Sequence, residues 1–340
     1  MTKILIMTLL LLALTAGQTL DTSPVTAEQN GTSQFIIGTL RGDGTLVPFA
    51  QYGNGGWWNP WPNPREAADS IYAESPEVMN HSLADLSEPW FKQCGQIPAS
   101  WFLSSSAEIF TALRALQVIK VTAHSGTNWG LLTDFPKRTS EDPLHDVVGV
   151  AVTARQRIEP FIEIETASPQ RKEISSFIKQ IFDVEETAEI DRMREETPPA
   201  IANPSSFPFS LSSEDRAKVE ASLTVLYGSS SVVNGKHVYY FEAEKQYQTR
   251  TASDPGCYDV SLFQGWISTD GKGGMGLMAN NFVFTDCDRK GPSTMIPVGI
   301  ITLKDQVFLF VREHGWEDES YTILELNQSR LQRVLQTVGA

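Results

Sequence analysis

The chain has 340 residues, of which 41% are hydrophobic and 20% are charged, enough for one large domain or two smaller ones. Its formal net charge of −14 argues against nucleic acid as a partner, because nucleic-acid binding depends on neutralising phosphates with basic side chains. The acidic balance favours solubility and by itself identifies no partner.

The first residues predict export. Lys3 precedes an apolar run over residues 4–13, and the small residues Thr15-Ala16-Gly17 follow. This order is typical of a signal peptide, and the apolar run is shorter than the roughly 20 residues that a membrane span needs. We expect a signal peptide over residues 1–17, cleaved near Gly17, then a mobile leader over 18–33. The mature protein would be secreted or periplasmic, with no membrane span.

The first ordered segment reads as a β-hairpin. Residues 35–40 and 45–52 form two mainly apolar runs, and the turn residues Gly42-Asp43-Gly44 separate them. Pro48 within the second run indicates an edge strand or a bulge.

A tryptophan-rich loop, GNGGWWNPWPNP, follows over residues 53–64. Trp57, Trp58 and Trp61 could form a sugar-binding platform, with Asn59 as a hydrogen-bonding partner. They could instead fill the core as a plug, since tryptophan is usually well buried and aromatic side chains anchor loops to sheets. We favour the plug and keep the platform as the alternative.

Strands are expected through most of residues 101–165, and one histidine among them could serve catalysis. His124 stands at an expected strand end, with Asp134 farther along the chain. Histidine is a natural general base near neutral pH, so these two residues are the catalytic candidates of a hydrolase. The chain lacks a Gly-x-Ser-x-Gly nucleophile motif, and we therefore favour a structural role for His124.

The clearest helix is expected around residues 170–186. Its apolar residues follow the spacing i, i+3, i+4, i+7, i+8, which places them on one face: Ile174, Phe177, Ile178, Ile181 and Phe182.

A proline-rich stretch over residues 197–211 is expected to be a linker or a surface strap. A second helix should begin after it, because Ser212 and Asp215 resemble a capping box. Gly228 would end that helix.

The last third again predicts hairpins, with an Asn234-Gly235 turn and a short terminal helix over residues 329–338. The fold class is therefore α+β and β-rich, with antiparallel hairpins in one or two sheets, two mid-chain helices and a short C-terminal helix. Residues 34–196 and 212–340 would form two lobes or one domain.

Three cysteines suit one disulfide in an oxidising compartment. We favour Cys257–Cys287, since both lie in one strand-rich segment, and pairing of Cys94 with either stays open. Asn30, Asn80 and Asn327 begin glycosylation motifs, which matter only in a eukaryotic source.

Asp286 and Asp288 are two residues apart before Gly291, and together with Asp270 they could hold a calcium ion. The pattern departs from the EF-hand loop, and turn formation explains it better, so we predict no cofactor.

These observations lead us to expect a non-enzymatic binding or envelope-associated module, with a polysaccharide or an envelope protein as its partner. The alternatives are a secreted hydrolase acting on a glycan or an ester, and an assembly component that offers a hairpin edge to a partner.

Overall fold

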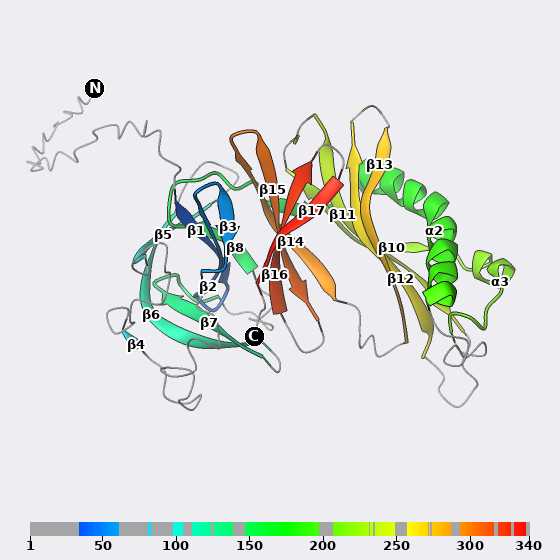
Figure 1. The fold of residues 1–340 in the computed structure, drawn as a ribbon, viewed down its shortest axis with the longest axis horizontal. Helices are drawn as coiled ribbons and strands as arrows, with labels where there is room; N and C mark the ends of the chain where they lie inside the picture. Colours follow the sequence, from blue (N-terminus) through cyan, green and yellow to red (C-terminus); the bar gives the residue numbers. More distant parts are fainter. Residues whose placement is uncertain are drawn as a thin grey trace, which may run out of the picture. The chain divides into compact units, whose positions relative to one another are not determined.

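A computed structural model describes most of the chain after residue 33, as one compact unit over Ser33–Ala340. The described residues are 34–60, 81–82, 98–104, 111–123, 126–138, 147–196, 207–230, 232–233, 235–248, 257–270, 272, 274–286, 293–315, 319–327 and 330–337. The expected signal peptide over 1–17 and leader over 18–33 lie outside them. Within this part of the chain, strands dominate and form three antiparallel sheets (Figure 1).

The first sheet contains a closed barrel. Its eight strands are β1 (Phe35–Arg41), β2 (Thr45–Gly53), β3 (Gly56–Trp58), β4 (His81–Ser82), β5 (Ser100–Leu103), β6 (Thr111–Ala123), β7 (Gly126–Thr133) and β8 (Val147–Val152). Six of them run in the order β1-β8-β5-β6-β7-β2, and β2 closes the ring by pairing with β1. The predicted hairpin of β1 and β2 is confirmed, with a register shift between Ile37 and Gly38 opposite Pro48.

The two remaining sheets are open. The five-stranded sheet has the order β13-β12-β11-β10-β9, and the four-stranded sheet has the order β14-β15-β16-β17. The first comprises β9 (Phe161–Glu163), β10 (Ser222–Ser229), β11 (His237–Tyr247), β12 (Asp259–Thr269) and β13 (Met275–Thr285). The second comprises β14 (Thr294–Leu303), β15 (Gln306–His314), β16 (Glu319–Asn327) and β17 (Arg330–Thr337).

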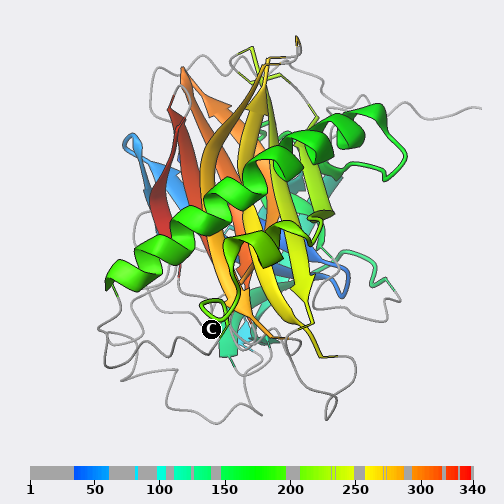
Figure 2. The ribbon, with the colours of Figure 1, turned by 90° about the vertical axis from the view of Figure 1, so that its right-hand side faces the viewer.

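The four-stranded sheet is buried on both faces, because alternate side chains of its strands point to opposite sides. Phe308 and Phe310 of β15 pack into the core that the sheet shares with the barrel. Leu309 and Val311 pack into a second core, against residues of the five-stranded sheet such as Trp266. The opposite face of the five-stranded sheet is covered by helix α2 (Pro169–Glu196), which runs across its strands (Figure 2).

Helix α2 confirms the predicted apolar stripe. Ile174, Ile178 and Phe182 are buried against the five-stranded sheet, and Phe177 and Ile181 are partly buried there. The helix continues to Glu196, so the charged segment after the stripe is helical as well.

Helix α3 (Ser213–Ala217) begins where it was expected and ends early. Ser212 is its N-cap, and the Ser212 hydroxyl oxygen accepts a hydrogen bond from the Asp215 backbone N–H at 3.1 Å. The predicted continuation to Gly228 is wrong, because residues 222–229 form β10 and pair with β11. Gly228 serves packing within the sheet: a Cβ there would meet the Tyr239 ring at 2.8 Å.

The predicted C-terminal helix is also wrong. Residues 330–337 form β17, which pairs with β16, and the sheets number three instead of one or two. Leu331, Val334 and Leu335 have the spacing of a helix face. In the strand, the register shift in the β16–β17 pairing allows all three to pack against neighbouring sheets. Leu331 packs toward the five-stranded sheet, and the other two pack toward the barrel.

Candidate functional site

Trp57 lies in the core and fits the interpretation of the loop as a plug. Its side chain is 8% exposed, and its ring lies 5.3 Å from the Phe308 ring and 5.6 Å from the Phe310 ring, measured between centroids. The tryptophan therefore joins the barrel to the four-stranded sheet.

The neighbouring Trp58 points outward. Its side chain is 41% exposed, and its indole N–H donates to the Gly53 carbonyl oxygen at 3.3 Å. Asn59 is exposed beside it, and Trp61 lies outside the described residues. Of the three predicted platform residues, only Trp58 presents a large aromatic surface within the described loop.

Asp134 directly follows β7 and lies beside Arg114 of β6. Its carboxylate accepts a hydrogen bond from the Arg114 backbone N–H at 2.7 Å. His124, the other catalytic candidate, lies outside the described residues, so the two cannot be placed together. The hydrolase hypothesis thus receives no support from this part of the barrel.

Asp270 stabilises the turn between β12 and β13. Its carboxylate accepts hydrogen bonds from the backbone N–H groups of Lys272 at 2.8 Å and Gly274 at 2.9 Å, which hold its pKa below the usual value. Asp286 follows β13, and Asp288 is outside the described region. Where the chain is described, no three His, Cys, Asp or Glu side chains gather in a way that could hold a metal ion.

Cys257 is buried just before β12, 7% exposed. Cys287 and Cys94 both lie outside the described residues, and the Cys257–Cys287 disulfide therefore stays a prediction.

A groove lies between α2 and β10, at a point where the five-stranded sheet is incomplete. Strand β9 pairs only with the end of β10, at Tyr227, Gly228 and Ser229. The first half of β10 extends beyond β9, so one edge of this half lacks a strand neighbour among the described residues.

Arg171 of α2 closes part of this open edge. Its guanidinium donates hydrogen bonds to the carbonyl oxygens of Ile164 at 3.0 Å, Leu223 at 3.2 Å and Thr224 at 2.9 Å. The side chain is 8% exposed, so these bonds satisfy backbone groups that water reaches poorly. Arg171 thus fixes the first turns of α2 above β10 and forms one end of the groove.

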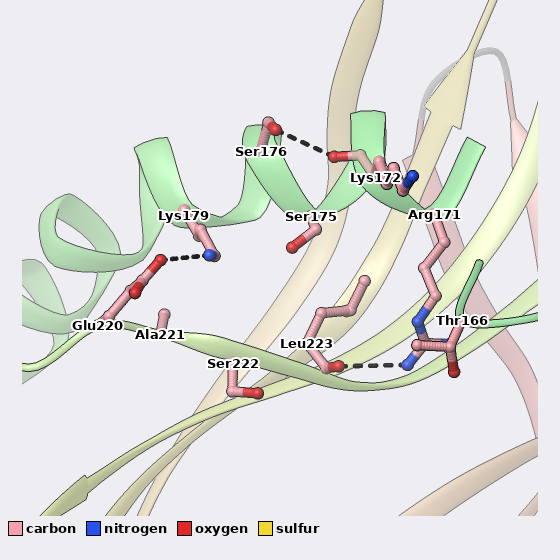
Figure 3. Close-up of a pocket in the computed structure, with 10 residues that line it drawn as sticks. All are labelled: Thr166, Arg171, Lys172, Ser175, Ser176, Lys179, Glu220, Ala221, Ser222 and Leu223. Atoms are coloured by element: carbon pink, nitrogen blue, oxygen red, sulfur yellow. Dashed lines mark hydrogen bonds and ion pairs between the residues drawn. The ribbon is translucent and has the colours of Figure 1, made fainter. Parts of the chain in front are cut away.

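The groove has a volume of about 470 Å³ and is mostly polar (Figure 3). Its lining residues are Thr166, Arg171, Lys172, Ser175, Ser176, Lys179, Glu220, Ala221, Ser222 and Leu223. Three of them are cations and one is a carboxylate, so the groove carries two net positive charges, although the whole chain is acidic.

The two lysines of the groove differ in whether they form an ion pair. Lys179 forms an ion pair with Glu220 across the groove and holds the pKa of that carboxyl below its usual value, through a hydrogen bond and charge attraction. Lys172 is exposed, and its ammonium group has no ion pair within the described part of the chain. Lys172 is therefore the cation most available to an incoming anion.

The groove is suited to binding and poorly suited to catalysis. Four hydroxyl groups line it, from Thr166, Ser175, Ser176 and Ser222, but no histidine or cysteine accompanies them. The only carboxylate, Glu220, is engaged by Lys179. A hydroxyl nucleophile needs an adjacent base, and among the described residues none of these four hydroxyls is hydrogen-bonded to a lysine or carboxylate side chain.

The sequence alone does not predict this groove, although it contains one relevant signal. Lys172, Ser175, Ser176 and Lys179 follow the spacing i, i+3, i+4, i+7, so they form a polar stripe on the predicted helix. Such a stripe is usually only a solvated face. What turns it into a groove wall is the shortness of β9, which the sequence does not reveal.

Comparisons with protein-family models, curated proteins and solved structures find no match for this chain. Neither helix in the described residues is both long and apolar enough to cross a membrane.

Proposed function

We propose that the protein is a non-enzymatic binding protein and that the groove between α2 and β10 holds an acidic polysaccharide. The observation that carries this proposal is the local charge: two net positive charges line the groove of a chain whose formal net charge is −14. A cationic groove on an acidic protein concentrates anions at one place, while the rest of the surface repels them.

The groove's hydroxyl groups favour a sugar as the carrier of the negative charge. Hydroxyl groups both donate and accept hydrogen bonds, as a sugar hydroxyl does, and Ser175 and Ser222 face the groove from opposite walls (Figure 3). The groove is open to solvent, so a polymer can bind in it from the side, and a chain end does not have to enter first. The expected signal peptide would deliver the protein to a compartment where envelope polysaccharides occur.

Calorimetric titration with polygalacturonate oligomers tests the proposal, with neutral dextran as the control ligand. We expect binding of the acidic polymer alone. Raising the salt from 0.1 to 1 M should weaken it strongly, because the Debye length falls from about 10 to about 3 Å. Lys172→Gln combined with Lys179→Gln should weaken binding by about tenfold, since each exposed ion pair contributes up to about 1 kcal/mol.

Lys272→Gln is the matched control, because Lys272 is an exposed lysine in the β12–β13 turn, outside the groove lining. It should leave the affinity unchanged. Equal binding of dextran, or equal losses in the groove and control variants, would refute the proposal. Release of new reducing ends from the polymer would favour the secreted hydrolase instead.

A further inference from the structure

A second cavity lies on the other face of the five-stranded sheet, where this sheet packs against the four-stranded sheet. Its volume is about 200 Å³. Trp266 of β12 lines it from one sheet, and Leu324 of β16 and Leu331 of β17 line it from the other. These side chains give the cavity an apolar floor. The groove beside α2 shares none of its lining residues.

One buried hydroxyl in this cavity has no partner. Thr322 of β16 lines the cavity and is 1% exposed, and its hydroxyl oxygen makes no hydrogen bond to any described residue. A buried hydroxyl without a partner is destabilising, whereas valine has nearly the same shape and would avoid the cost. The presence of threonine in place of valine at this position is therefore better explained by a hydrogen bond to a ligand than by packing between the sheets.

The polar groups at the rim balance one another. Arg333 donates to the Gln336 side-chain oxygen at 2.7 Å, and the Gln336 amide donates to the Glu313 carboxylate at 3.4 Å. Because Arg333 and Glu313 both line the cavity, its two charged side chains are of opposite sign and are linked through Gln336. The rim therefore presents no net charge and does not call for a charged ligand.

The five-stranded sheet contributes an amide side chain. Gln264 lines the cavity and is 2% exposed, and its side-chain oxygen lies 3.4 Å from the Tyr240 hydroxyl oxygen. The Tyr240 hydroxyl donates its proton to Glu242 at 2.7 Å, which fixes the position of the tyrosine ring beside Gln264. Gln264 and Thr322 thus line the cavity from two different sheets.

We propose that this cavity binds one unit of an uncharged sugar. Its volume is below the roughly 300–1,000 Å³ that is typical of drug-sized ligands, so the occupant must be small. A pyranose ring has apolar C–H faces that match Trp266 and Leu324, and its edge carries hydroxyls that match Thr322 and Gln264. The site is independent of the proposed groove function and uses different chemistry.

Saturation-transfer NMR and calorimetry on the full chain test this site, with glucose, galactose, N-acetylglucosamine and zwitterionic leucine as probes. We expect at least one of the sugars to bind and leucine not to bind. Thr322→Val should weaken sugar binding by about tenfold, the effect of losing one hydrogen bond, and Thr322→Ser should retain most of it. Thr322→Val should keep the Tm or raise it by about 2 °C.

Thr302→Val supplies the matched control, because Thr302 is an exposed threonine in a strand of the same sheet. It should bind sugar as the wild type does, and so should Lys172→Gln of the groove. Three results would overturn the inference: no sugar binds, leucine binds in place of a sugar, or Thr322→Val binds sugar unchanged. A fall in Tm of several degrees in Thr322→Val that is absent in Thr322→Ser would instead give the hydroxyl a structural role and equally reject the site.

Discussion

The barrel end and the helix end of the molecule use their polar and aromatic residues in opposite ways. In the barrel, the residues that are conspicuous in the sequence have structural roles: Trp57 is buried in the core, and the Asp134 carboxylate binds the backbone of Arg114 on the neighbouring strand β6. Between α2 and the five-stranded sheet, ordinary lysines and serines remain exposed and line a groove. Conspicuous residues are thus poor guides to a binding site when neighbouring groups already satisfy them.

A buried ionic cluster at the barrel end also has a structural role. Glu319 accepts hydrogen bonds from Arg41 of β1 at 2.8 Å and from Arg312 of β15 at 2.6 Å, and all three side chains are at most 1% exposed. The Tyr321 hydroxyl donates to the same carboxylate at 2.7 Å. The cluster joins the barrel to the four-stranded sheet.

Glu319→Gln is expected to have the largest effect on stability. It removes the carboxylate and leaves two buried guanidinium groups without their shared charge partner, which costs about 3–5 kcal/mol. Denaturant unfolding would measure the loss. Affinity for polygalacturonate, measured under conditions where the variant stays folded, should not change. An unaltered free energy of unfolding would show that the cluster does not hold the barrel to the four-stranded sheet.

The same carboxylate predicts how stability depends on pH. Burial alone would raise the pKa of Glu319, but attraction from Arg41 and Arg312 outweighs burial, and the pKa is lowered. A carboxyl with a lowered pKa contributes stability above its unfolded-state pKa of about 4.3, and the contribution is lost as the pH falls through the folded value. Unfolding measured from pH 6 to pH 2 should show this loss in the wild type and a smaller loss in Glu319→Gln.

Trp57→Ala and Trp58→Ala compare two neighbours with opposite environments. We expect Trp57→Ala to cost about 3 kcal/mol, since it opens a cavity among the aromatic rings of the core. Trp58→Ala should cost less than about 1 kcal/mol, because that side chain is 41% exposed. Thermal unfolding measures both. Loss of polysaccharide binding in Trp58→Ala, with stability retained, would move the binding surface to the tryptophan loop.

Arg171→Met is expected to have an intermediate effect that involves both stability and binding. It leaves three backbone carbonyls near the edge of β10 without their donor and should cost about 2 kcal/mol. It also removes one groove cation. Arg171→Lys restores the charge without the planar fork, so we expect it to recover affinity and not stability. Equal recovery of both quantities would mean that the two roles of Arg171 cannot be separated.

The sequence predicts this fold best where the signals are local. The stripe of Ile174, Ile178 and Phe182 and the cap at Ser212 depend on neighbouring residues in the chain, and both are confirmed. The helix predictions that reach Gly228 and cover residues 329–338 are wrong because they rest on end signals and on helical spacing alone. Pairing with the neighbouring strands β11 and β16 decides the structure of residues 222–229 and 330–337.

Neither the groove nor the second cavity could be predicted from the sequence. The groove exists because β9 is only three residues long, and the second cavity exists because two sheets meet imperfectly around Thr322. Both are consequences of packing between segments that lie far apart in the chain. No local pattern of residue types records such packing.

The most direct test of the proposed function exchanges the charges of the groove's ion pair. Lys179→Glu alone removes the two net positive charges of the groove, and Lys179→Glu combined with Glu220→Lys restores them with the pair reversed. We predict that the single variant binds polygalacturonate at least about tenfold more weakly than the wild type and that the double variant recovers to within about threefold. Wild-type affinity in the single variant would contradict the account, because the polymer would then bind elsewhere.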